Sequence, residues 1–154
     1  MPKITLEDVV ETSGTNYPAP FAAPCMARRK KAIGDAGGLT QFGAHIITLA
    51  PGAWSSQRHW HSAEDELVMI LEGHPILIDN DGETQLNPGD ITTHPANDGN
   101  GHHMKNQTEQ DVKFLIIGTR NAETDHAHYS DIDLDLPANG TAKRDYHRKD
   151  GTPY

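Results

Sequence analysis

The feature that most constrains the fold is a succession of short apolar runs. From Leu39 onward, runs rich in Ile, Val, Leu and Phe alternate with clusters of Gly, Pro, Asn and Asp. Runs of this length between turn-forming residues are typical of β-strands. No segment before residue 120 has the 3.6-residue spacing of an amphipathic helix. The sequence therefore predicts an all-β fold, with strands at 42–49, 56–61, 66–71, 75–79, 83–86, 90–94, 102–106 and 112–118.

The breaks between these runs predict tight connections. Asn80-Asp81-Gly82 is typical of a hairpin turn, because Gly, Asn and Asp tolerate the positive φ that such turns require. Pro51-Gly52 and Pro88-Gly89-Asp90 mark two further turns. Many short strands must close into a barrel or stack as a sandwich, since open sheet edges invite aggregation. A barrel of about eight strands encloses room for one small ligand.

The flanking segments have a different character. We expect one domain, divided into an N-terminal arm (1–38), a β-barrel core (39–119) and a C-terminal tail packed on the barrel (120–154). Asp131–Asp135 alternates like an edge strand. The basic run Arg28–Lys31 is either a solvated patch on the arm or a site for a substrate phosphate or carboxylate.

Charge and composition exclude several classes of partner. The net charge of −9, from 22 acidic and 13 basic residues, disfavours nucleic acid and anionic membranes. No stretch approaches the ~18 to 20 apolar residues of a membrane span. A single cysteine, Cys25, and an N-terminus without a secretory pattern favour the cytoplasm. The expected partners are a small molecule and a second copy of the chain.

Strand alternation groups two histidines and a carboxylate. His59 and His61 are two residues apart, so on a strand both leave the same face, as two ligands of one ion require. Glu66 shares a face with Val68 and Ile70 on the next strand. A carboxylate on an otherwise apolar face needs a partner to offset its desolvation, and a metal supplies one.

The later strand adds a third histidine. His102 shares a face with Met104, whereas His103 shares the opposite face with Lys105, and Lys105 is the residue expected in water. The alternation therefore places His102 inward and His103 at the outer rim. We predict that His59, His61, Glu66 and His102 bind one divalent transition metal, for which Mn, Fe, Ni, Co and Zn all suit the ligands.

These residues fall in a spacing that resembles the two motifs of the cupin superfamily. Gly52, then His59-Trp-His61, Glu66 and Gly73 is similar to the first motif, with one extra residue before the first histidine. The second motif is matched by Gly82, Pro88-Gly89-Asp90, Pro95-Ala96, His102 and Asn106, with an insert at residues 97–101. The resemblance covers about residues 39–119 and implies a jelly-roll barrel, a double-stranded β-helix.

The resemblance extends to small cupins likened to sugar-phosphate isomerases. Similar stretches are Gly-Asp-Ala-Gly-Gly, Arg-His-Trp-His-Ser-Ala-Glu-Asp-Glu and Lys-Asp-Gly-Thr-Pro-Tyr. It implies a metal-dependent enzyme, isomerase-like, acting on a small oxygen-rich substrate such as a sugar, sugar phosphate or carboxylate. Two alternatives stay open, a metal-dependent dioxygenase and a non-catalytic small-molecule binding or sensor protein, because cupins share a fold across several reactions.

Other candidate residues have simpler interpretations. Alternation points Asp65 away from the metal, as a solvated carboxylate. The histidines at 94, 126 and 128 are either surface residues or proton shuttles at the barrel mouth. Packing roles are expected for the remaining candidates, Cys25, Tyr17, Trp60 and Tyr129.

One strand also predicts self-association. If Val68 and Ile70 face the interior, Leu67, Met69 and Leu71 lie on the opposite face. In a monomer that face would be in water unless the arm or tail covered it. We therefore predict a homodimer, which the resemblance to cupins also implies.

Overall fold

In the computed structural model, which describes residues 3–141 and 143–154, the chain is built almost entirely of strands. The strands are β1 (Glu11–Ser13), β2 (Arg28–Lys31), β3 (Phe42–Leu49), β4 (His59–His61), β5 (Glu66–Glu72), β6 (Ile76–Asp79), β7 (Gly82–Gln85), β8 (Ile91–His94), β9 (His103–Lys105), β10 (Val112–Thr119), β11 (Ala127–Tyr129) and β12 (Asp135–Leu136). The helices are one-turn elements, α1 (Ala19–Ala22), α2 (Ile33–Ala36) and two 3-10 turns (Leu6–Asp8 and Ala23–Cys25). The predicted all-β class is confirmed, and no helix in these ranges is long and apolar enough to cross a membrane.

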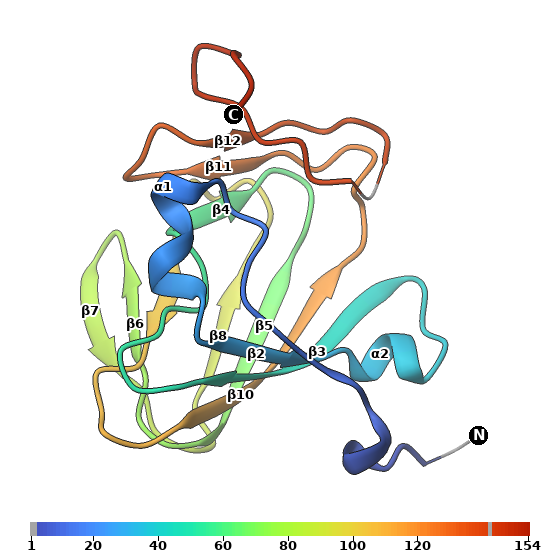
Figure 1. Cartoon of the computed structure of the whole chain (residues 1–154), viewed down its shortest axis with the longest axis vertical. Coiled ribbons are helices and arrows are strands. Elements are labelled where there is room, and N and C mark those ends of the chain that lie inside the picture. Colours follow the sequence, from blue (N-terminus) through green and yellow to red (C-terminus); the bar gives the residue numbers. More distant parts are fainter. Residues whose placement is uncertain (1–2, 142) are drawn as a thin grey trace.

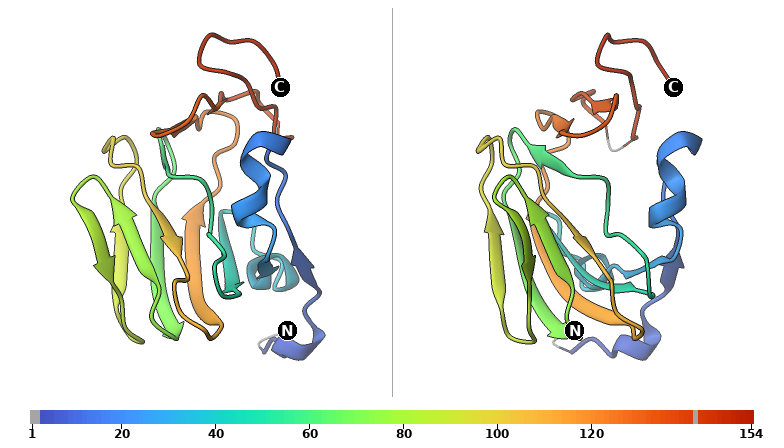
Figure 2. Two further views of the ribbon diagram at one scale, coloured as in Figure 1. Left: turned by 60° about the vertical axis from the view of Figure 1, so that its left-hand side comes forward. Right: turned by 90° about the vertical axis from the view of Figure 1, so that its left-hand side faces the viewer.

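The described strands form three sheets. The large sheet has the order β1-β2-β3-β10-β5-β8, the small sheet has the order β7-β6-β9, and the end sheet has the order β12-β11-β4. All the pairings are antiparallel. The end sheet lies across one end of the other strands, with the chain's C-terminus beyond it (Figure 1). The large and small sheets stack face to face rather than joining into one continuous hydrogen-bonded barrel, which is the sandwich form of the two predicted arrangements (Figure 2).

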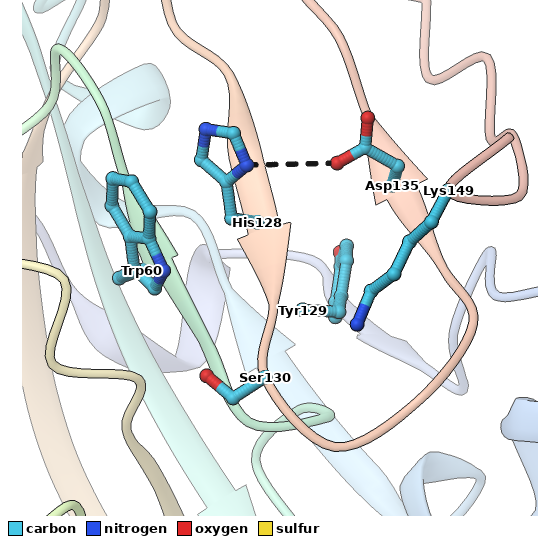
Figure 3. A pocket seen from close by; sticks show the side chains of 6 residues that line it. All are labelled: Trp60, His128, Tyr129, Ser130, Asp135 and Lys149. Carbon is cyan, nitrogen blue, oxygen red and sulfur yellow. Dashed lines mark ion pairs between the residues drawn. The ribbon is translucent and has the colours of Figure 1, made fainter. Parts of the chain in front are cut away.

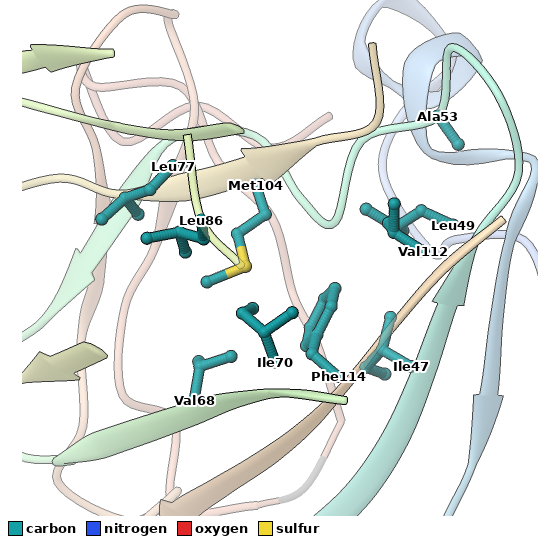
Figure 4. Close-up of a cluster of buried hydrophobic side chains, with 10 residues drawn as sticks. All are labelled: Ile47, Leu49, Ala53, Val68, Ile70, Leu77, Leu86, Met104, Val112 and Phe114. Atoms are coloured by element: carbon teal, nitrogen blue, oxygen red, sulfur yellow. The ribbon is translucent and has the colours of Figure 1, made fainter. Parts of the chain in front are cut away.

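The core lies between the large and the small sheet. Side chains from β3, β5 and β10 meet Leu77, Leu86 and Met104 from the opposite layer (Figure 4). The large-sheet members are Ile47, Leu49, Val68, Ile70, Val112 and Phe114, each at most 3 % exposed. Burying each such side chain is worth about 1.5–3 kcal/mol. The predicted inward orientation of Val68 and Ile70 is therefore correct.

The flanking segments add to the sheets. The basic run Arg28–Lys31, expected on an arm, forms β2 and pairs with β3. Arg29 pairs with Asp111 and Glu11, and Lys31 Nζ donates to the Leu6 carbonyl, so these cations have structural partners.

The tail contributes β11 and β12 to the end sheet. The edge strand expected at Asp131–Asp135 is wrong in position, since the strand is β12 at Asp135–Leu136 and the preceding residues bend. That bend lets Leu134 and Leu136 bury against Tyr129 in a second apolar cluster, which also contacts Tyr17 and Phe21 of the N-terminal segment. Packing of these aromatic and aliphatic side chains overrides the alternation that the acidic residues suggested.

Candidate metal centre

The four predicted ligands, hereafter the inner cluster, come together at the junction of the end sheet and the large sheet. The Nε2 atoms of His59 and His61, on β4, lie 3.2 Å apart. Ligand atoms of these two residues and of Glu66, at the start of β5, all lie within 4.8 Å of one another. The backbones of His102 and His59 form an isolated antiparallel β-bridge. The side chain of His102 places its Nε2 atom 2.9 Å from Glu66 Oε2.

All three imidazoles are oriented by hydrogen bonds on the side away from the cluster. Each Nδ1 atom donates to an oxygen: that of His59 to the Gln57 carbonyl at 2.8 Å, that of His61 to the Asp125 carboxylate at 2.6 Å, and that of His102 to the Asn100 carbonyl at 3.4 Å. An Nδ1–H donor leaves the Nε2 lone pair free to bind a metal. The His59 and His61 lone pairs therefore face the Glu66 carboxylate, and His102 Nε2 contacts that carboxylate directly.

This convergence fits a cation. Two imidazole nitrogens 3.2 Å apart repel each other unless a proton or a metal ion lies between them. Metal–nitrogen bonds of about 2.0–2.1 Å at near right angles place two nitrogens about 3 Å apart. Three imidazoles and one carboxylate suit first-row divalent metals and leave positions for water or substrate in an octahedral site.

The electrostatics of the cluster also fit. Burial, reinforced by the neighbouring His61 and His102, lowers the pKa of His59 to about 3, so its ring is neutral at pH 7. Burial alone would raise the pKa of Glu66, but contact with His102 and the nearby His61 and His59 hold that pKa below its usual range. Although burial opposes it, the hydrogen bond with Asp125 raises the pKa of His61, so a metal that binds His61 must displace a proton there. Neutral imidazole and ionised carboxylate are the forms that bind metals.

Asp125 was not among the predicted site residues. Its Oδ2 accepts the His61 Nδ1–H, and its Oδ1 accepts the Ala63 backbone N–H at 2.9 Å. Although burial opposes it, the hydrogen bond from His61 lowers the pKa of Asp125. Asp125 lies 64 residues after His61, just before β11, and only the pairing of β11 with β4 brings the two together. The local sequence carries no signal for this contact.

Contacts of Gly101 hold the backbone just before His102 in place. A Cβ atom on Gly101 would overlap the Ser130 hydroxyl, so a larger residue there would force Ser130 to shift. Arg58 clamps the same point: it binds Asp131 with two hydrogen bonds of 2.7 and 2.9 Å and donates to the Gly101 carbonyl at 3.2 Å. The insert before His102 is thereby tied to the end sheet.

The two histidines beside His102 behave differently from expectation. His103 points away from the inner cluster as predicted, but its placement at the outer rim is wrong: it is 4 % exposed. Its Nδ1 donates to the Ser56 carbonyl at 2.8 Å and its ring meets Trp54 edge-on. His94, expected at a barrel mouth, is buried and stacks on His102 with ring centroids 3.5 Å apart. Burial and the neighbouring His102 lower the pKa of His94 to about 4.

The remaining candidates have structural surroundings. Asp65 is exposed, as predicted, and accepts the Ala96 backbone N–H. Cys25 is fully buried, and burial raises the pKa of its thiol to about 11, which makes it unreactive. Tyr129 stacks on His59, with Tyr17 against it, and Trp60 stacks on His128. His126 and His128 lie on the other face of the end sheet.

Comparison with known proteins gives three levels of similarity. Residues 45–118 match the model of the cupin domain family. The crystal structure of a sugar phosphate isomerase of a cupin superfamily, from Silicibacter pomeroyi, has a TM-score of 0.94 with this chain. Its sequence is 41 % identical, over 99 % of this chain and 96 % of its own. A putative sugar phosphate isomerase from Acidithiobacillus ferrooxidans is 27 % identical over 82 % of this chain and 80 % of its own, with a TM-score of 0.74. The sequences of curated proteins give no match.

Proposed function

This chain belongs to the cupin superfamily, and we propose that it is a metal-dependent isomerase of a small oxygen-rich substrate, with a sugar phosphate as the first candidate. The inner cluster carries the proposal, because it brings three oriented imidazoles to an ionised carboxylate. The similarity over nearly the whole chain to a protein described as a sugar phosphate isomerase supports the substrate class.

In this proposal His59, His61, Glu66 and His102 hold one divalent metal. When bound, the metal acts as a Lewis acid that stabilises negative charge on adjacent substrate oxygens while a proton moves. The protein holds the ligand rings in place: Asp125 fixes the His61 tautomer, and the stacked rings of His94 and Tyr129 fix the planes of His102 and His59. The apolar layer of Val68 and Ile70 beside Glu66 limits the access of water from the core side.

The experiment begins with elemental analysis of the native protein, followed by incubation with a panel of aldose and ketose phosphates in deuterated solvent. We expect NMR to show interconversion and uptake of deuterium at the carbon next to the carbonyl group. The double variant His59→Ala/His61→Ala should be inactive, and Asp65→Asn, which alters an exposed carboxylate nearby, should retain activity.

Two outcomes would replace the proposal. Consumption of dioxygen by the Fe(II) form with no deuterium uptake would make the protein an oxygenase. Metal-dependent binding of a small acid with neither reaction would make it a binding or sensor protein. Both outcomes would leave the metal site in place and overturn the isomerase assignment.

A further inference from the structure

A second group of metal-binding side chains lies on the end sheet, outside the inner cluster. We propose that His126, His128 and Asp135, hereafter the outer cluster, form a second site for a divalent transition metal. One ligand atom from each of the three residues lies within 4.8 Å of the other two. The site is separate from the proposed isomerase centre and does not depend on that assignment.

The register of the end sheet places the two clusters on opposite faces. His59 pairs with Tyr129 and His61 with Ala127, and their side chains face the inner cluster. Between them, Trp60 pairs with His128, which pairs in turn with Asp135. Since alternate residues of a strand face opposite sides, these three face outward. Figure 3 shows Trp60, His128 and Asp135 side by side across the three strands.

The carboxylate of Asp135 contacts both imidazoles. Its Oδ2 lies 2.8 Å from His126 Nε2, and its Oδ1 lies 3.7 Å from His128 Nδ1. The two rings stack with centroids 3.9 Å apart and an interplanar angle of 17°. Two imidazoles two residues apart in sequence, one just before β11 and one on it, with a carboxylate on β12, can reach one ion after small side-chain rotations.

The outer cluster is accessible from solvent. Its side chains are 31 %, 35 % and 23 % exposed for His126, His128 and Asp135. A hollow of about 410 Å³ beside them is lined by Trp60, His128, Asp135 and Lys149 among others (Figure 3). Three protein ligands would leave further positions open to water or a small ligand. Imidazole and carboxylate suit Zn²⁺, Cu²⁺ and Ni²⁺. A bound ion would also join β11 to β12, which is only two residues long.

Zinc stoichiometry tests the proposal. The metal-free protein is dialysed to equilibrium against increasing Zn²⁺, and bound zinc is counted per chain. We expect two ions for the wild type, one for His126→Ala/His128→Ala and one for the inner variant His59→Ala/His61→Ala. His74→Ala, which removes an exposed histidine remote from both clusters, should still bind two. A wild type that binds a single ion, lost only in the inner variant, would overturn the proposal.

The fluorescence of Trp60 gives a second and local measurement. The Trp60 and His128 rings stack with centroids 4.2 Å apart, so Cu²⁺ bound at His128 should quench the indole. Quenching is measured in the variant Trp54→Phe/His59→Ala/His61→Ala, which lacks the other tryptophan and two of the inner ligands. There we expect saturable quenching by Cu²⁺, reversed by a chelator and abolished by adding His128→Ala. Undiminished quenching after His128→Ala would contradict the site.

Discussion

The two faces of the end sheet both carry histidines and carboxylates, but the two sets differ in exposure and in hydrogen bonding. On the inner face the His61 and His102 side chains are only 9 % exposed, and each imidazole Nδ1, including that of His59, donates to an oxygen. On the outer face the His126 and His128 rings stack on each other and share one carboxylate in a partly exposed setting. Burial and hydrogen bonding behind the ring, rather than residue type, distinguish a preorganised site from an adaptable one.

The large sheet shows the same contrast in its apolar residues. On β5 the inward Val68 and Ile70 are almost fully buried. Outward on the same strand, Leu67 and Met69 are partly exposed and Leu71 is 37 % exposed. Ile91, which pairs with Met69 on edge strand β8, is 57 % exposed. Packing in the core explains why the inward residues are apolar. It does not explain why these outward residues are apolar.

The largest expected effect separates two adjacent histidines on opposite faces. His102→Ala should weaken metal binding by at least ~100-fold, because it removes a ligand, and His59→Ala or His61→Ala should do the same. His103→Ala should leave metal affinity unchanged, because His103 faces Trp54. Metal content after dialysis measures all four variants. An empty site in His103→Ala with a full one in His102→Ala would reverse the assignment of the two faces.

Much of this arrangement could be predicted from the sequence, because alternation is a local property. The strand predicted at 42–49 is β3 itself, and the hairpin at Asn80-Asp81 joins β6 to β7. The inward positions of Glu66 and His102 followed from their apolar neighbours on the same face. Each of these predictions depended only on residues within one strand or turn.

The rest could not be predicted, because it depends on pairing between distant segments. Asp125 reaches His61 only through the end sheet, whose strands β11 and β12 are three and two residues long. Strands that short contain too few residues for a pattern. His103 was misplaced because Lys105, on the same face, keeps its charge at the edge by lying over the Trp54 ring, while His103 is buried against that ring.

The outward face of β5 is the next test. We predict that it forms a homodimer interface, because β1 and β2 pair beyond β3 and leave β5 uncovered by the arm strands. Light scattering at micromolar concentration should give about 34 kDa, twice the chain mass of 16.9 kDa. Met69→Glu should reduce this to the monomer mass, since it puts a charge into the patch. Thr84→Glu, on β7 of the other layer, is the control, and a wild-type monomer would refute the interface.

Two carboxylates on opposite faces of the end sheet give a smaller and sharper test. Asp125→Asn should weaken binding at the inner cluster by about 10–100-fold, because the amide no longer fixes the His61 tautomer. Asp135→Asn, which alters the outer carboxylate, should leave that affinity unchanged. Competition with a chromophoric chelator measures the tighter site in both variants. Equal losses would mean that Asp125 acts through general stability rather than by positioning His61.

The smallest effect concerns pH and the buried His103 of the metal-free protein. Burial lowers the pKa of His103 to about 4 from an ordinary value of 6.5. The unfolded chain binds this proton more readily than the folded protein does. The contribution of His103 to the free energy of unfolding is therefore fully present above pH 6.5 and is lost as the pH falls toward 4. His59 and His94 act in the same direction, so the contribution must be isolated by difference. Urea unfolding of wild type and His103→Gln at pH 7.5 and 4.5 should show the variant losing about 2 kcal/mol less. Equal losses would mean that His103 accepts its proton in the folded state.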